Sequence, residues 1–318
     1  MVGGSDGGAA ARRQRGGGPG GRAEQGAPLA AGWFAGATSI VVGQPFDLFK
    51  TRLQVGVPLR ELSHRADLAQ SLRRVYRGVL PPLLTVGLVG SLHFTLYEGC
   101  KRRLLARERE RAPGAAVPLD TYLRLTLVSG SFGGAWISLI TIPTGLVKVQ
   151  QQVLSSLGMV ATARNLVRAH GWKVMYRGVL PGFLMEFIGR GVYICTFEAV
   201  KAAQLDAPLA ERLAQGELVE VPLRAKLLAA ACAGTMGWLA VYPCDVIKSV
   251  MYADAGGARL PTFLSAARHL YREGGVPRFF RGLRWSLLRA SPVAASVLPM
   301  YEYSRDALAR QLARLDPD

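Results

Sequence analysis

Long apolar stretches alternate with short charged segments along this chain of 318 residues. Residues 25–46, 125–147 and 227–244 contain no charged side chain, and in residues 78–97 only His93 is ionisable near neutral pH. Each stretch is long enough, or nearly so, to cross about 30 Å of hydrocarbon. The pattern predicts six membrane helices, over residues 29–55, 80–104, 119–153, 182–205, 224–252 and 284–311.

Three short elements recur about a hundred residues apart, always in the same order. The first element reads Pro45-Phe-Asp47-Leu-Phe-Lys50, Pro143-Thr-Gly145-Leu-Val-Lys148 and Pro243-Cys-Asp245-Val-Ile-Lys248. The second reads Tyr76-Arg77-Gly78, Tyr176-Arg177-Gly178 and Phe280-Arg281-Gly282. The third reads Tyr97-Glu98-x-x-Lys101, Phe197-Glu198-x-x-Lys201 and Tyr301-Glu302-x-x-Arg305. Repetition at a fixed spacing predicts tandem repeats with threefold pseudosymmetry.

Each repeat is expected to contain two membrane helices with a short amphipathic helix in the loop between them. The repeats cover residues 28–112, 119–211 and 222–312, and the fold class is an all-α membrane protein. Small residues before each proline, such as Gly130 and Gly134, let neighbouring helices approach closely, and the proline itself bends its helix. Residues 1–27 are rich in Gly and Arg and predict a disordered extension; whether it is a cleaved transit peptide stays open.

Composition narrows the function classes further. The formal net charge of +17 suits either nucleic acid or an anionic membrane surface. Zinc-finger spacing, a basic heptad region and an aromatic ribonucleoprotein signature are all missing, so a nucleic-acid partner is not expected. The four cysteines form no C-x-x-C pair, and no metal site is expected. Without paired carboxylates, a P-loop or G-x-S-x-G, the sequence does not predict an enzyme.

The repeated elements resemble those of the mitochondrial carrier family, and the resemblance covers nearly all of residues 28–312. It implies a monomeric transporter of the mitochondrial inner membrane that alternates access to one central site. Six crossings place both termini on the same side, and the resemblance assigns that side to the intermembrane space. The basic loops within the repeats fit the matrix side by the positive-inside rule.

The resemblance also implies two layers of ion pairs, which we call the matrix gate and the cytoplasmic gate. In the matrix gate the expected pairs are Asp47–Lys148 and Asp245–Lys50, supported by Gln54 and Gln152, with Lys248 left unpaired because Gly145 replaces the acid. In the cytoplasmic gate the expected pairs are Glu98–Lys201, Glu198–Arg305 and Glu302–Lys101, supported by Tyr97 and Tyr301. With two pairs against three, we expect the matrix gate to be the looser of the two.

The substrate contacts implied by the resemblance lie on the even-numbered helices, at Thr85, Met185, Glu186, Arg190 and Arg289. The guanidinium of Arg289 suits a carboxylate, and Glu186 suits an ammonium group. Arg289-Ala-Ser-Pro292 resembles the branch that carries ornithine-type basic amino acids and carnitine or acylcarnitine, although Met185 stands where those relatives usually have Arg. For three of these residues an alternative to substrate binding stays open. In the first alternative Glu186 and Arg190 only neutralise each other, and in the second Met185 is a packing residue.

We therefore expect an antiporter of small zwitterionic or cationic metabolites. The alternatives are a carrier of nucleotides or nucleotide-like cofactors and a non-transporting scaffold on the same fold. No cofactor is expected. Bound cardiolipin is expected from the resemblance, at the second repeated element, which contains Arg77, Gly78, Arg177, Gly178, Arg281 and Gly282.

Overall fold

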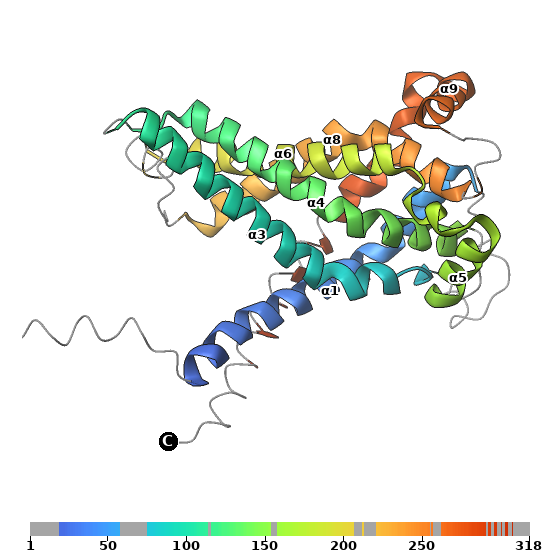
Figure 1. The fold of residues 1–318 in the computed structure, drawn as a ribbon, viewed down its shortest axis with the longest axis horizontal. Coiled ribbons are helices and arrows are strands. Elements are labelled where there is room, and N and C mark those ends of the chain that lie inside the picture. The colour runs from blue at the N-terminus through green and yellow to red at the C-terminus, as the bar shows by residue number, and fades with distance from the viewer. Residues whose placement is uncertain are drawn as a thin grey trace, which may run out of the picture. The chain divides into compact units, whose positions relative to one another are not determined.

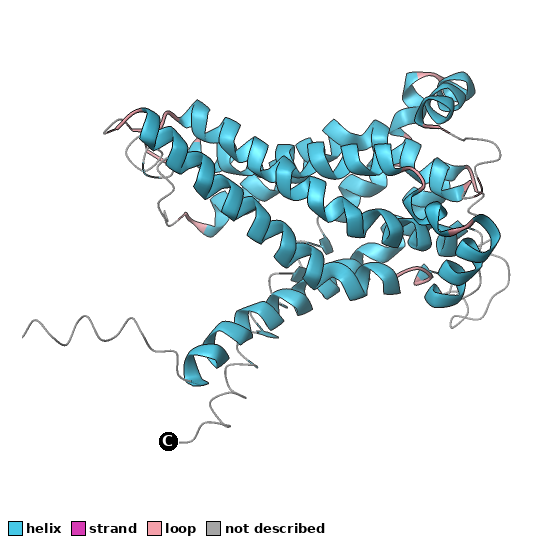
Figure 2. Cartoon of the chain, in the orientation of Figure 1, coloured by secondary structure: helices cyan, strands magenta, loops and turns pink. Residues whose placement is uncertain are grey.

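The helical elements of the chain are seen in a computed structural model (Figure 2). It describes residues 19–57, 75–113, 116–153, 158–206, 212, 221–254, 256, 262–290, 292–293, 296–297, 300, 303–304 and 307, without the side chains of 19–32 and 223. These residues form helices and turns, and no strand occurs among them. The chain divides into two units, Ile40–Pro292 and a second unit of Met1–Ser39 with Val293–Asp318. The site described below lies in the first unit.

Long helices dominate the described residues: α1 (Pro19–Val55), α3 (Leu80–Arg111), α4 (Leu119–Val153), α6 (Val179–Ala202) and α8 (Leu223–Ala253). The shorter elements are α5 (Met159–His170), α9 (Phe263–Gly274) and the 3₁₀ turns η2 (Trp172–Tyr176) and η3 (Val276–Phe280). Within residues 40–292, α4 packs on α3 and α6, and α6 packs on α8, so neighbours in sequence are neighbours in space (Figure 1).

Four helical segments among the described residues are long and apolar enough to cross a membrane, namely Leu80–Arg111, Leu119–Val153, Trp172–Ala202 and Arg224–Ala253. The sixth helix predicted from the sequence, over residues 284–311, is described in part, and its described residues, at 284–290, 292–293, 296–297, 300, 303–304 and 307, are helical. α1 begins at Pro19, within the segment 1–27 for which the sequence predicts a disordered extension. Proline is well tolerated in the first turn of a helix, although Gly20 and Gly21 follow it before Arg22, Ala23, Glu24 and Gln25.

Glycines on α4 allow α6 to lie close against it. A Cβ atom at Gly130 would lie 3.1 Å from the carbonyl oxygen of Arg190, and one at Gly134 would overlap the carbonyl oxygen of Glu186. Because both neighbours are backbone atoms, no side-chain rotation relieves the overlap. The equivalent Gly234 has no described atom within 4 Å of such a Cβ. Close packing through small residues therefore positions Glu186 and Arg190 in the second repeat.

The second repeated element satisfies a backbone group that a proline leaves free. Pro143 lies inside α4 and has no N–H, so the carbonyl of Leu139 loses its usual helical donor. The hydroxyl of Tyr176 donates to that carbonyl at 3.2 Å. The glycine that ends this element has a positive φ in all three copies, 75° at Gly78, 66° at Gly178 and 92° at Gly282. This left-handed backbone conformation explains why glycine stands there.

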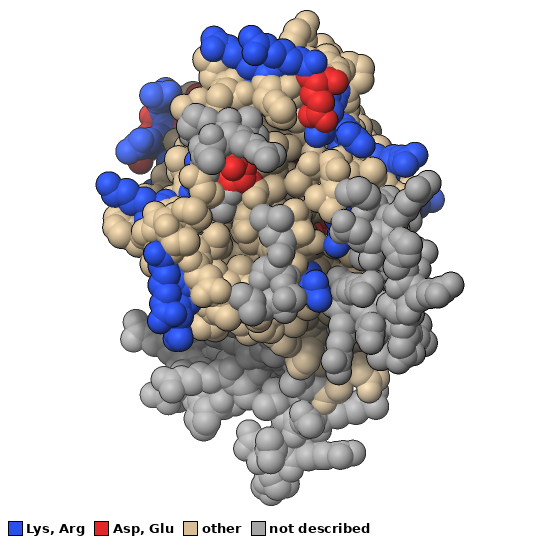
Figure 3. Space-filling model, turned by 90° about the vertical axis from the view of Figure 1, so that its right-hand side faces the viewer, with Lys and Arg blue, Asp and Glu red and all other residues tan. Residues whose placement is uncertain are grey.

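The short helices α5 and α9 lie at the same end of the long helices (Figure 1). Each buries one apolar side, including Leu166 on α5 and Leu270 on α9. The exposed sides are basic, with Arg164, Arg168, Arg268 and Arg272. Lys and Arg dominate the charged side chains visible at this end of the molecule (Figure 3). A basic end is typical of the side of a membrane protein that is not translocated.

Candidate functional site

Ion pairs join α1, α4 and α8 in the middle of residues 40–292. The ammonium of Lys148 lies 2.6 Å from Asp47 Oδ2, and the ammonium of Lys50 lies 2.8 Å from Asp245 Oδ2. Both expected pairs of the matrix gate are therefore formed. All four side chains are largely buried, with 20% or less of each exposed. Such pairs between helices hold the three helices together in this conformation.

The pair of Lys50 and Asp245 has further polar and aromatic support. The amide of Gln54 donates to Asp245 Oδ2 at 2.7 Å, as the sequence predicts. The ammonium of Lys50 also lies 4.0 Å from the ring centroid of Trp238, which is within the range of a cation–π interaction. This contact between Lys50 and Trp238 was not predicted from the sequence.

The pair of Asp47 and Lys148 is supported differently from what the sequence predicts. Both amide atoms of Gln152 are buried, and neither makes a hydrogen bond to the described residues, so the predicted support from Gln152 is absent. Instead, Arg289 Nε lies 3.6 Å from Asp47 Oδ1, the oxygen that Lys148 does not take. Arg289 reaches this position because Gly43 leaves room for its guanidinium. The predicted substrate contact Arg289 thus lies against the matrix gate.

Lys248 is the third lysine of the matrix gate, and it has no acidic partner among the described residues. Its side chain is buried, and among the described residues no carboxylate oxygen lies within 4.0 Å of its ammonium. The nearest polar neighbours are Met185 Sδ at 3.9 Å and the ring of Tyr252, whose centroid is 5.4 Å away. Gly145, which stands in the repeat where an acid is expected, lies beside Lys248, as the sequence predicts.

Three cavities adjoin these ion pairs. The first, about 160 Å³, lies within the matrix gate and is lined by all its charged groups, together with Arg289 and Trp238. The second, about 230 Å³, is lined by Thr85, Thr141, Thr144, Lys148, Glu186 and Lys248. The third, about 310 Å³, is lined by Met185, Glu186, Arg190, Tyr193 and Trp238. The predicted contacts other than Arg289 thus line the second and third cavities, and Glu186 lines both.

Glu186 is the acid of these two cavities. It is 7% exposed, and its Oε2 lies 3.2 Å from Arg190 Nε on the same helix. Arg190 has 40% of its side chain exposed and lines the third cavity. His93 packs nearby, with its ring against Gly133 and its Nε2 3.5 Å from the carbonyl oxygen of Gly130. The hydroxyl of Thr85 donates to the carbonyl of Pro81 at 3.0 Å, within its own helix.

In the cytoplasmic gate, one of the three predicted pairs, Glu98–Lys201, lies wholly within the described residues. Glu98 lies 3.0 Å from Lys101, and Glu198 lies 2.6 Å from Lys201, so both acids pair within their own helices. The predicted pair of Glu98 with Lys201 is therefore not formed in this conformation. Tyr97 is buried, with the ammonium of Lys101 4.7 Å from its ring centroid. The predictions for Tyr301, Glu302 and Arg305 lie outside the described residues.

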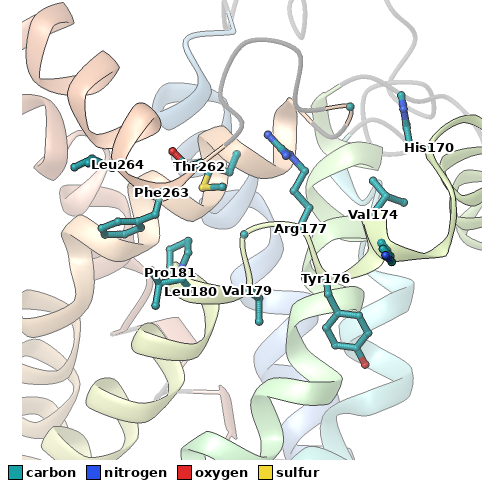
Figure 4. Close-up of a pocket in the computed structure, with 14 residues that line it drawn as sticks. His170, Val174, Tyr176, Arg177, Val179, Leu180, Pro181, Thr262, Phe263 and Leu264 are labelled. Atoms are coloured by element: carbon teal, nitrogen blue, oxygen red, sulfur yellow. The ribbon is translucent and has the colours of Figure 1, made fainter.

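A larger cavity, about 660 Å³, lies where α6 and α9 begin. Gly178 is one of its lining residues. Val179 lines one part, and Thr262, Phe263 and Leu264 line another (Figure 4). The first turn of a helix has backbone N–H groups without helical acceptors, so these two ends present donors towards this region. Arg177 borders the cavity, but its Nε donates to the carbonyl of Asp254 at 2.8 Å.

The other two copies of this element are anchored by their backbones. Gln44 donates to the carbonyl of Arg77 at 2.8 Å, and a Cβ at Gly78 would lie 2.8 Å from the carbonyl of Lys148. Gly282 also lies near α1, because its Cβ would be 3.4 Å from the carbonyl oxygen of Lys50. The element thus packs each repeat against the gate of its neighbour.

Several polar residues near the gate carry no repeat signal and were not predicted. Gln150 donates to the carbonyl of Tyr252, and Tyr252 donates to the carbonyl of Ile142 at 3.1 Å. Arg278 is buried and donates to the carbonyl of Gln54 at 2.7 Å, while its Nε lies 3.1 Å from Glu273. These contacts tie α8 to α4 and η3 to the end of α1.

Long apolar helices, repeated motifs and ion pairs beside central cavities define an all-helical, multi-pass membrane protein built from repeats. A family model described as "Mitochondrial carrier protein" matches residues 22–108, 121–207 and 219–312. The chain therefore belongs to the mitochondrial carrier family and has its fold of three repeats. Because members of this family transport small molecules, the protein is a transporter and not an enzyme, and its expected location is the mitochondrial inner membrane.

Curated relatives cover almost the whole chain. The mitochondrial glycine transporter YMC1 of Saccharomyces cerevisiae is 31% identical over 86% of this chain and 89% of its own length. The mitochondrial basic amino acids transporter of Bos taurus is 31% identical over 88% of this chain and 93% of its own length. The mitochondrial carnitine/acylcarnitine carrier-like protein of Arabidopsis thaliana is 28% identical over 88% of this chain and 97% of its own length.

Proposed function

We propose that the protein exchanges small zwitterionic or cationic metabolites of the basic amino acid or carnitine type across the mitochondrial inner membrane. The observation that carries this proposal is the buried Glu186, which lines two of the central cavities. A buried acid inside a membrane protein is costly and usually functional, and Glu186 suits an ammonium or quaternary ammonium group. Three relatives are named as transporters or carriers of glycine, basic amino acids and carnitine/acylcarnitine, which supports a substrate of this kind.

The two gates support a mechanism of alternating access. The pairs of the matrix gate cross between helices, whereas the described pairs of the cytoplasmic gate stay within single helices. We infer a conformation closed towards the matrix, in which a substrate enters the cavities from the intermembrane space. Closing the other gate requires Glu98 and Glu198 to exchange their partners within the helix for partners on neighbouring helices. A monomer with six crossings and both termini in the intermembrane space completes this proposal.

Exchange in proteoliposomes tests the substrate class. Purified protein is reconstituted with internal lysine, ornithine, glycine, carnitine or ATP, and uptake of the same labelled compound is measured. We expect uptake of at least one of the first four compounds to rise at least tenfold with matching internal substrate. Exchange of ATP alone would replace the proposal with a nucleotide carrier. No exchange of any compound, by protein that is correctly folded, would favour a non-transporting scaffold.

We also propose that cardiolipin binds in the cavity between the first turns of α6 and α9. The first turns of α6 and α9 have N–H groups without helical acceptors, although Thr262 accepts from the N–H of Ser265 in α9. Two such helix ends suit the two phosphates of this lipid, and the exposed Lys173 lines the same cavity. The anchoring of Arg177 by Asp254 suggests that this arginine shapes the site rather than reaching for the phosphate.

Removing and restoring the lipid tests this site. We expect cardiolipin to raise the unfolding temperature of the delipidated protein by several degrees, and phosphatidylcholine to have little effect. Lys173→Gln should reduce the shift by about half, because one phosphate partner is lost. Arg168→Gln is the matched control, since Arg168 is exposed on α5 and does not line the cavity. Equal shifts in the two variants would contradict the assignment.

A further inference from the structure

Lys248 is a buried cation with no carboxylate oxygen of the described residues within 4.0 Å of its ammonium. It is 8% exposed, while the equivalent lysines, Lys50 and Lys148, lie 2.8 and 2.6 Å from carboxylates. A charged group buried in protein is costly unless it is paired. Met185 and the ring of Tyr252 offer Lys248 only weak interactions. The described residues thus leave one strong acceptor missing at this ammonium.

The place for that acceptor is defined by Gly145. A Cβ built on Gly145 would lie 3.8 Å from the ammonium nitrogen of Lys248 and 3.3 Å from the ring of Tyr252. An acid at position 145 would therefore reach the ammonium. With glycine there, a carboxylate from outside the chain has access to Lys248 instead.

Lys248 also connects the cavities. It lines the cavity of the matrix gate, which Arg289 shares, and the cavity of Thr85 and Glu186, which Arg289 does not line. Arg289 has Asp47 as a nearby acid, at 3.6 Å. A solute that places its cationic end against Glu186 therefore meets Lys248 in the same cavity, and meets Arg289 only beyond it.

The balance of charge around the three cavities favours a ligand that brings a negative group. The acids lining them are Asp47, Asp245 and Glu186. The bases lining them are Lys50, Lys148, Lys248, Arg190 and Arg289. Five bases and three acids leave an excess of two positive charges. A purely cationic solute would increase this imbalance, whereas a carboxylate reduces it.

We propose that Lys248 binds the carboxylate of the substrate, which then takes the place of the acid that position 145 lacks. The inference rests on the proposed function and makes it more specific: the substrate is a carboxylate with a cationic group, and its binding completes the third ion pair of the matrix gate. Bound substrate then stabilises the conformation in which the other two pairs are formed. Lys248 on α8 is thus a binding residue, and it distinguishes carboxylates from neutral analogues.

Two substitutions at position 145 test the proposal with matched size. Gly145→Asp supplies a carboxylate of the chain to Lys248, which should compete with the substrate. Gly145→Asn has nearly the same volume and makes the same approach to Tyr252, but it carries no charge. We expect the KM for lysine exchange of Gly145→Asp to be at least tenfold above that of Gly145→Asn. Equal KM values in two folded variants would overturn the proposal.

Substitution of Lys248 itself gives a second readout. Lysinamide carries the amide in place of the carboxylate of lysine, so the wild type should bind lysine at least tenfold more tightly, as measured by competition for uptake. In Lys248→Met this ratio should fall to about threefold or less, and Lys248→Arg should restore most of it. A ratio that persists in Lys248→Met but is lost in Arg289→Gln would assign the carboxylate to Arg289 and overturn the proposal.

Exchange by the wild type distinguishes a failure of the proposed function from a failure of the assignment of Lys248. If it exchanges lysine, ornithine, glycine or carnitine, the variants are measured with that compound, and its neutral amide or ester replaces lysinamide. An unchanged preference for the carboxylate in Lys248→Met then overturns the role of Lys248 while leaving the proposed function intact. If the wild type exchanges none of these carboxylates, the proposed function fails and the assignment of Lys248 fails with it.

Discussion

Replacing Lys50 by methionine is expected to lower exchange at least tenfold and to lower the unfolding temperature clearly. Methionine retains much of the length and the apolar character of the side chain but removes its charge. Asp245 would then be a buried carboxylate supported only by Gln54 among the described contacts of its Oδ2. Breaking a buried ion pair by removing one partner costs about 3–5 kcal/mol. The contact of Lys50 with Trp238 is lost as well.

Thermal unfolding in detergent and exchange in proteoliposomes measure the two parts of this prediction. The control is Asp120→Asn in the pair of Asp120 and Arg124, which are 63% and 80% exposed at their side chains. Exposed pairs contribute about 0–1 kcal/mol, so this variant should behave almost as the wild type. The double variant Lys50→Asp with Asp245→Lys restores opposite charges and should recover part of the exchange. If Lys50→Met matched Asp120→Asn in both measurements, the pair would have no part in the gate.

The two pairs of the matrix gate could be predicted because the repeats share one register. The paired residues occupy corresponding positions in the repeats, namely Asp47, Lys50, Lys148 and Asp245. A threefold arrangement brings the ends of α1, α4 and α8 next to one another. The same register marked Gly145 as the missing acid. Two helices could also be predicted closely, since the predicted bounds 119–153 and 224–252 match α4 and α8 to within one residue.

Contacts outside the repeat pattern could not be predicted. Arg289 Nε lies 3.6 Å from Asp47 Oδ1 because Gly43 leaves space on the facing helix, and the repeat register does not relate these two positions. Gln150 binds a backbone carbonyl, which any residue offers, so its partner has no sequence signal. The predicted pair of Glu98 with Lys201 is not formed for a different reason. Lys101 is three residues from Glu98 on the same helix and lies 3.0 Å from it, and a sequence does not state which conformation of a transporter is populated.

Replacing Glu186 by glutamine should raise the KM for lysine about 10- to 100-fold. The shape of the side chain is retained, but a charge-assisted hydrogen bond worth about 1.5–3 kcal/mol is lost. The loss should be specific for the cationic end of the substrate. 6-Hydroxynorleucine has a hydroxyl in place of the side-chain ammonium of lysine, and the wild type should prefer lysine. In Glu186→Gln this preference should nearly disappear, as measured by competition for uptake.

Arg190→Gln provides the matched control, because it removes the other member of the same ion pair. Without Arg190, Glu186 still lines the cavity that it shares with Lys248, so the acid stays available to the substrate and the preference for lysine should remain. If Glu186 served only to neutralise Arg190, both variants would change KM alike and neither would change the preference. A preference lost in Glu186→Gln and kept in Arg190→Gln therefore assigns the acid to the substrate. Together with Lys248 at the carboxylate, Glu186 would then determine which end of the solute faces which helix.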